Sequence, residues 1–130
     1  MKIYIASKLS NCAQVLLLES VLRLREHEIT FSWASEHAAE LRNPPPVPVP
    51  HGRDIADRCL RGVSLAELLI LWPAGNSRGA HIEYGAALNA NKKILLLEPD
   101  DENMISFYKI VERVRTTKEL LEHPLCQKVR

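Results

Sequence analysis

The chain has 130 residues, of which 46% are hydrophobic and 25% charged, a composition typical of one folded domain over residues 1–130. Seventeen lysines and arginines stand against sixteen aspartates and glutamates. The formal net charge of +1 gives no broad basic surface, so a nucleic-acid polymer is not an expected partner. These values exclude a two-domain enzyme, a coiled coil and a disordered chain.

The cysteine and hydrophobicity patterns point to a reducing, aqueous compartment. Cys12, Cys59 and Cys126 are odd in number and include no C-x-x-C pair, so neither a zinc site nor a disulfide framework is expected. The apolar run at 68–72 is far shorter than the roughly 20 residues of a membrane span, and the N-terminus lacks signal-peptide features. We therefore expect a cytoplasmic protein with no metal and no membrane partner.

Strand and helix patterns alternate along the first half of the chain. Residues 3–6 predict a strand, and after turn residues at 7–11 a helix follows, with apolar residues at spacings of three and four. Residues 29–33 alternate in polarity and predict a second strand, joined to the first by a right-handed β-α-β crossover. Residues 44–50 hold five prolines. We interpret them as a stiff surface loop in preference to a docking peptide for an SH3-like partner.

The second half continues the alternation. A helix is expected over 53–63, with Ile55 and Cys59 on one apolar face. Residues 68–72 are apolar at every position, as in a strand at the centre of a parallel sheet with helices on both faces. The remaining expected elements are a loop at 73–79, a helix rich in small residues at 80–91, a strand at 94–97, a short helix near 103, a fifth strand at 110–114 and a last helix at 117–123.

This order of elements predicts an α/β fold with a doubly wound, mostly parallel sheet of four or five strands, of the flavodoxin or Rossmann type. In such sheets ligands bind beyond the carboxyl ends of the strands, where the strand order reverses. A site is therefore expected among the loop after the first strand, the end of the second strand with the Pro-rich segment, and the loop at 73–79 with the helix that follows it.

Glu83 is the first candidate for chemistry in that region. We expect it in the first turn of the helix at 80–91, where free backbone N–H groups and the helix dipole favour its ionised form. An ionised carboxylate at the mouth of a cleft can attack the anomeric carbon of a sugar and form a glycosyl-enzyme. The structural alternative is an acid that only complements the helix dipole.

Five segments in the same order resemble the nucleoside 2-deoxyribosyltransferase family, which includes the deoxynucleoside 5′-monophosphate N-glycosidases. They are KIYIAS at 2–7, ITFSW at 29–33, AELLIL at 66–71, GAHIEYGAA at 79–87 and KKILL at 92–96. The resemblance covers nearly the whole chain. It implies an enzyme that cleaves or transfers the N-glycosidic bond of a (deoxy)nucleoside or its 5′-monophosphate, without metal or organic cofactor, as a homodimer or higher homo-oligomer.

The resemblance also assigns site residues by position. It implies that Glu83 is the covalent nucleophile and that Tyr4, on the first strand, contacts its carboxylate through the phenol hydroxyl. Substrate binding is implied for two loops, by Ser7 and Lys8 at the sugar or its 5′-phosphate and by Asn76, Ser77 and Gly79 on the other side. Hydroxyls, an ammonium group and free N–H groups at a helix start suit a phosphate.

One position departs from the family pattern. The family has an aspartate eight residues before the acid that opens the third strand, and that acid is Glu67 here, so the count arrives at Cys59. Asp57 is the candidate to contact or protonate the base in its place, although two residues along a helix point to opposite sides.

Two other functions stay open beside the enzyme. Cys59 in place of an acid favours a catalytically weak or inactive module that binds or senses a nucleotide. A fold relative that cleaves the nicotinamide bond of NAD is the third reading. Three aromatic residues are candidates to stack on a base, with packing in the core or a loop as the alternative: Trp33, Trp72 and Tyr84.

Overall fold

The computed structural model describes residues 1–44, 52–73, 77–97, 108 and 110–129. Five strands form one all-parallel sheet in the order β2-β1-β3-β4-β5. The strands are β1 (Lys2–Ser7), β2 (Glu28–Ile29), β3 (Leu68–Trp72), β4 (Lys93–Leu97) and β5 (Glu112–Val114). This order is that of a flavodoxin-like doubly wound sheet, so the predicted fold class is confirmed.

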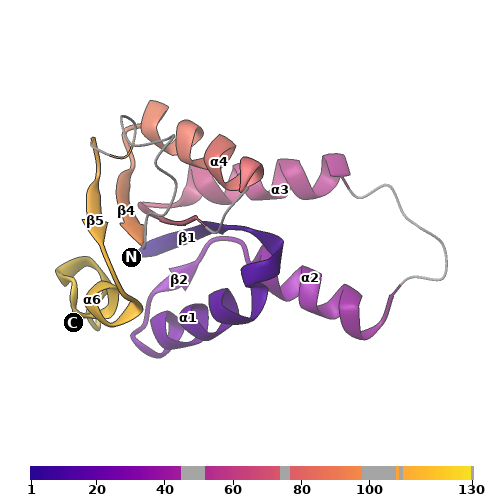
Figure 1. The fold of residues 1–130 in the computed structure, drawn as a ribbon, viewed down its shortest axis with the longest axis horizontal. Coiled ribbons are helices and arrows are strands. Elements are labelled where there is room, and N and C mark those ends of the chain that lie inside the picture. Colours follow the sequence, from indigo (N-terminus) through magenta and orange to yellow (C-terminus); the bar gives the residue numbers. More distant parts are fainter. Residues whose placement is uncertain (45–51, 74–76, 98–107, 109, 130) are drawn as a thin grey trace.

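Helices cover both faces of the sheet (Figure 1). On one side lie α3 (Gly52–Leu65) and α4 (Arg78–Asn89), and on the other lie α1 (Cys12–Leu24) and α6 (Thr117–Glu122). Helix α2 (Trp33–Arg42) packs against α1. Short 3₁₀ turns at Leu9–Asn11 and Pro124–Cys126 precede α1 and follow α6. Within the described ranges, no helix has both the length and the apolar character needed to cross a membrane.

The two central strands form the core and set the position of the site. Every residue of β3 is buried, and so are the four central residues of β1, as expected for strands that helices cover on both faces. The strands pair in register from Ile3 with Leu68 to Ser7 with Trp72. Their carboxyl ends therefore meet at the switch point of the sheet, which is where ligands bind in this fold.

The strand that was predicted at 29–33 ends at Ile29, and helix α2 begins at Trp33 after three residues without regular structure. Strand β2 contains only Glu28 and Ile29, and Trp33 begins the helix. The reason is a helix cap, because the Ser32 hydroxyl accepts a hydrogen bond from the backbone N–H of Ser35 at 3.1 Å. Alternating polarity over so few residues does not distinguish a strand from a strand end followed by a capped helix.

The other elements lie within a few residues of their predicted ranges. The predicted strands at 3–6, 68–72 and 94–97 are present, and the fifth strand is shorter than predicted. The predicted helices at 53–63, 80–91 and 117–123 are also present. The helix predicted near 103 and residues 45–50 of the Pro-rich segment lie outside the described residues.

Candidate active site

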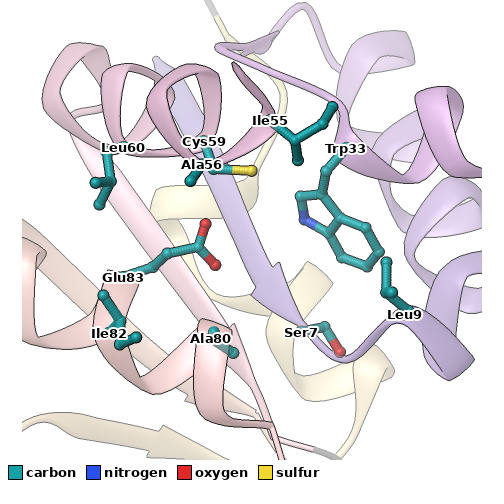
Figure 2. A pocket seen from close by; sticks show the side chains of 11 residues that line it. Ser7, Leu9, Trp33, Ile55, Ala56, Cys59, Leu60, Ala80, Ile82 and Glu83 are labelled. Carbon is teal, nitrogen blue, oxygen red and sulfur yellow. The ribbon is translucent and has the colours of Figure 1, made fainter. Parts of the chain in front are cut away.

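Glu83 projects from α4 into a cavity of about 260 Å³ beside the carboxyl end of β1 (Figure 2). Its side chain is mostly buried but keeps 9% of its surface exposed, so the carboxyl group is within reach of a ligand. The cavity lies between β1, α2, α3 and α4. Its lining residues are Ser7, Leu9, Trp33, Ile55, Ala56, Cys59, Leu60, Gly79, Ala80, Ile82 and Glu83.

The environment of Glu83 differs from the one predicted. Helix α4 begins at Arg78, so Glu83 lies in its second turn and not its first. Burial raises the pKa of Glu83 to about 7, against the smaller opposing effect of hydrogen bonds from Tyr4 and Cys59. The expectation that the helix start would favour the ionised carboxylate is wrong, because loss of water around the group outweighs it.

Tyr4 is the hydrogen-bond partner of this carboxyl group. It is fully buried on β1, and its hydroxyl donates a hydrogen bond to Oε2 of Glu83. Burial, followed by the nearby carboxylate charge, raises the pKa of Tyr4 well above its usual range, so the phenol remains a protonated donor. The contact that the resemblance implies is therefore present, while the catalytic roles of the two residues stay predictions.

Gly62 allows α3 to approach this pair closely. A Cβ atom at Gly62 would lie 2.9 Å from Cδ2 of Tyr4 and 2.9 Å from Cβ of Phe31, distances at which the neighbouring atoms would have to move. Only a residue without a side chain lets the helix pack on the tyrosine ring at this point. The close approach brings Cys59, one turn earlier on α3, to the cavity.

Cys59 completes a cluster with Tyr4 and Glu83. Its thiol lines the cavity beside the Glu83 carboxyl group (Figure 2), and both Tyr4 and Glu83 contribute to the shift of its pKa. Burial is the main cause of a raised pKa for Cys59, so the group is held as a neutral thiol. The helical spacing of Ile55 and Cys59 predicted one apolar face for both, but it did not predict that Cys59 would line a cavity with Glu83.

The remaining walls of the cavity are apolar. Trp33 begins α2, and its Nε1 donates a hydrogen bond of 2.7 Å to the backbone oxygen of Ile5, which fixes the indole. Ile55, Ala56 and Leu60 come from successive turns of α3. An apolar chamber with a few polar groups at its base is the usual form of a small-molecule pocket. Of the three aromatic candidates for stacking, Trp33 is the one among the lining residues.

Of the two candidate residues in the first loop, Ser7 lines the cavity and Lys8 does not. Ser7 lines the cavity, but its hydroxyl donates to the backbone oxygen of Trp72 at 2.7 Å and accepts from Nδ2 of Asn11 at 3.0 Å. The side chain therefore ties the ends of β1 and β3 together. Lys8 is half-buried and is not among the lining residues.

The second loop contributes one described residue to the cavity. Gly79 lines it, close to the start of α4. Ser77 is buried next to this helix, where its hydroxyl lies 3.3 Å from Nδ1 of His81 and outside the cavity lining. Asn76 lies outside the described residues.

The structure does not bring Asp57 to the site. Its side chain is exposed on α3, away from the lining residues, because two steps along a helix turn the side-chain direction by about 200°. Cys59 occupies the position that faces Glu83 instead. Among the described residues, no group of three histidine, cysteine or acidic side chains is placed to hold a metal ion.

No protein-family model and no curated protein matches the chain. Among solved structures, it is similar to a 2-deoxyribosyltransferase of Bacillus psychrosaccharolyticus, with a TM-score of 0.69, 20% identity and coverage of 95% of this chain and 92% of the other. It is also similar to the CMP N-glycosidase of Clostridium botulinum, with a TM-score of 0.60, 19% identity and coverage of 94% and 96%. The chain therefore has the fold of these proteins over nearly its full length.

Proposed function

We propose that this protein cleaves or transfers the N-glycosidic bond of a nucleoside or nucleotide, with Glu83 as the covalent nucleophile. The observation that carries the proposal is the buried Tyr4–Glu83 hydrogen bond at the base of a ligand-sized cavity. The two similar solved structures are a 2-deoxyribosyltransferase and a CMP N-glycosidase. The same fold with a carboxyl group aimed into the switch-point cavity supports this reaction class.

Two displacements at the anomeric carbon make up the proposed reaction. The ionised carboxylate of Glu83 forms a bond to this carbon while the bond to the base breaks, and the electron pair departs with the base. Water or a second base then attacks the same carbon and releases the carboxylate. The configuration is retained, because each displacement inverts it once.

Tyr4 prepares the carboxyl group for this attack. Its hydroxyl holds one oxygen of Glu83 in place and lowers the pKa that burial has raised. The ionised fraction of Glu83 at neutral pH is therefore larger than burial alone would allow. In the proposed reaction Tyr4 is a positioning residue, and Trp33 and the α3 side chains enclose the base.

A substrate panel tests the proposal. The purified protein is incubated with deoxynucleosides, ribonucleosides, their 5′-monophosphates and NAD, with and without a free acceptor base, and chromatography follows base release or exchange. We expect release by the wild type, none by Glu83→Gln, and an unchanged rate in Asp57→Asn, which makes the same acid-to-amide change at an exposed site. Base release that survives Glu83→Ala contradicts the nucleophile assignment.

Trapping the intermediate gives direct support. A nucleoside with fluorine at the 2′ position slows breakdown of a glycosyl-enzyme, so mass spectrometry of digested protein should locate the added sugar on Glu83. The homo-oligomer implied by the resemblance stays a prediction, and light scattering of the same preparation measures it.

A second candidate is a module that binds a nucleotide without turning it over. Cys59 favours it, because a neutral thiol lies where the resemblance implies an acid. Clear binding of a panel compound, with no base release at any pH, would support the module and exclude the enzyme.

A further inference from the structure

A single carboxyl group supplies charge to a cavity with apolar walls. Among the described lining residues, Glu83 and the Cys59 thiol are the only side chains that can ionise, and they face Trp33 and Leu60 among others. An ionised carboxylate in such surroundings has lost most of its hydration. A ligand with a positive charge compensates this loss better than a neutral ligand of the same shape.

Trp33 adds a second feature that favours a positive charge. The indole lies across the cavity from Glu83 (Figure 2) and is 6% exposed. Its N–H group is already used in the bond to Ile5, so the ring system is what remains for a ligand. Tryptophan rings attract cations through their π-electrons. A planar, positively charged ring that stacks on the indole face therefore lies in the same cavity as the Glu83 carboxylate, which compensates its charge.

Tyr4 and Cys59, the two side chains that lower the pKa of Glu83, are weak acids. The Tyr4 proton is committed to the Glu83 carboxylate, and burial raises the pKa values of both Tyr4 and Cys59. A neutral base leaves as an anion unless an acid protonates it as the bond breaks. A positively charged base leaves as a neutral molecule, because the electron pair of the broken bond cancels its charge.

Binding of a cation also brings Glu83 into its reactive form. With a pKa of about 7, a large part of this carboxyl group is protonated at neutral pH. A positive charge within a few ångströms lowers that pKa, and by linkage the ionised carboxylate strengthens binding of the cation. A neutral substrate produces no such change, so it meets a smaller population of the nucleophile.

We infer that the substrates of this site are N-glycosides whose base carries a positive charge, such as pyridinium or N7-alkylated purine nucleosides; the inference rests on the proposed function. An oxygen of Glu83 forms a bond to the anomeric carbon while the bond to the cationic nitrogen breaks and the base leaves neutral. Water then attacks the glycosyl ester, which yields the free sugar, the regenerated carboxylate and one proton.

A matched pair of substrates tests the inference. 7-Methylguanosine and guanosine, each also as the 2′-deoxy form, differ by the methyl group that makes the base cationic. Because the methylated compounds are intrinsically more labile, kcat/KM is divided by the uncatalysed rate in the same buffer. We expect this enhancement to be at least about tenfold larger for the methylated member. An equal or smaller enhancement overturns the inference and leaves the proposed function standing.

A binding measurement separates the charge preference from turnover. 1-Methylnicotinamide is a cation and 3-methylbenzamide is its neutral isostere, and titration calorimetry at pH 8 compares the two. The cation should bind at least about tenfold more tightly to the wild type and to Asp57→Asn, and this preference should disappear in Glu83→Gln. Equal affinities overturn the inference. A charge preference without turnover of any nucleoside overturns the proposed function and supports the charge selectivity of the site.

Cys59→Asp tests the part played by the weak acids. An aspartate at this position places a carboxylic acid beside Glu83, which can protonate a departing neutral base. The variant should increase the rate with guanosine relative to 7-methylguanosine by about tenfold or more. Cys59→Ser, with no comparable acid, is the matched control and should leave the ratio near that of the wild type. A ratio that Cys59→Asp does not change contradicts the inference.

Discussion

Glu83 and Glu19 are both buried carboxyl groups with a raised pKa, yet their surroundings are different. Glu19 is fully buried on α1. One of its oxygens accepts a 2.6 Å hydrogen bond from the Ser32 hydroxyl, and the other, Oε2, has no partner among the described residues. Glu83 accepts a hydrogen bond from Tyr4, and it lines an open cavity together with Cys59.

The difference shows what separates a site from a structural acid. Burial is the largest cause of the raised pKa at both residues, so a perturbed pKa alone does not identify chemistry. Glu19 joins α1 to Ser32, which caps α2. Glu83 combines the same perturbation with space for a ligand, which is the property that a catalytic group requires.

The largest expected effect is on activity. Glu83→Gln should lower kcat/KM by roughly 10³-fold or more, because an amide cannot act as the nucleophile. Glu19→Gln makes the same change at a residue that lines no described cavity, and its kcat/KM should stay within about threefold of the wild type. Steady-state kinetics on both variants decides the comparison. A loss of similar size in the two variants would mean that both carboxyl groups act only through the fold.

The second effect is on stability as a function of pH. The folded pKa of Glu83 is about 7, against an ordinary value of 4.5, so the folded state binds more protons than the unfolded state between these values. Its contribution to the free energy of unfolding therefore falls as pH rises from about 4.5 to 7, by on the order of 2–3 kcal/mol. Glu83→Gln should remove this contribution. The pKa of Glu19 is also raised, so Glu19 makes a separate contribution of the same sign, which Glu19→Gln should remove.

Urea unfolding at pH 5 and pH 8 measures both contributions. Both variants should gain stability relative to the wild type at pH 8 and little at pH 5. If either variant is less stable than the wild type at pH 8, its carboxyl group is better solvated than the structure indicates.

Tyr4→Phe should come next in size. The variant loses one hydrogen bond to a charged group and should lower kcat/KM by about 10- to 100-fold. Because the Tyr4 hydroxyl lowers the pKa of Glu83, activity of the variant should rise with pH at a midpoint above that of the wild type. A pH–rate profile measures the midpoint. An unchanged midpoint with reduced kcat would assign Tyr4 a packing role only.

Gly62→Ala perturbs the same site indirectly, through the packing of α3 on Tyr4. The new methyl group would press on Tyr4 and Phe31, so the free energy of unfolding should fall by roughly 2 kcal/mol and kcat/KM should fall with it. Gly85→Ala is the matched control, because no atom lies within 4 Å of a Cβ there. It should be stabilising by about 0.5–1 kcal/mol, from its higher helix propensity. Thermal unfolding of the two variants should therefore shift in opposite directions.

The smallest effect is expected at the partner of Glu19. Ser32→Ala removes the cap of α2 and the hydrogen bond to the buried carboxyl group, at a cost of about 1 kcal/mol. Activity should stay within about twofold, because Ser32 is outside the cavity lining. A larger loss of activity would show that the start of α2, with Trp33, has moved.

Much of the fold was predictable, because its strongest signals are local. The continuous apolar run at 68–72 predicted the central strand, and burial of every residue in β3 confirms it. Helix α2 was not predicted, since the capping role of Ser32 depends on the backbone turning away after β2. Short segments with mixed polarity carry too little periodicity to decide between the two structures.

The candidate site was predictable only in part. The pairing of Tyr4 with Glu83 came from family resemblance, since no local pattern joins residues so far apart in the chain. The raised pKa of Glu83 results mainly from burial, which depends on the packing of elements that are far apart in the chain. The apolar face that holds Ile55 and Cys59 was visible in the sequence, but the cavity in front of it was not.

The burial of Tyr4 and Glu83 differs from that of the cavity walls on α3, and the difference has a consequence for redesign. Tyr4 and Glu83 belong to the interior, whereas Ala56 is exposed and Leu60 is 42% exposed on α3. Substitutions at such positions usually change stability by no more than about 0.5 kcal/mol. A library restricted to Ala56 and Leu60 can therefore change the shape of the cavity while the Tyr4–Glu83 hydrogen bond stays intact.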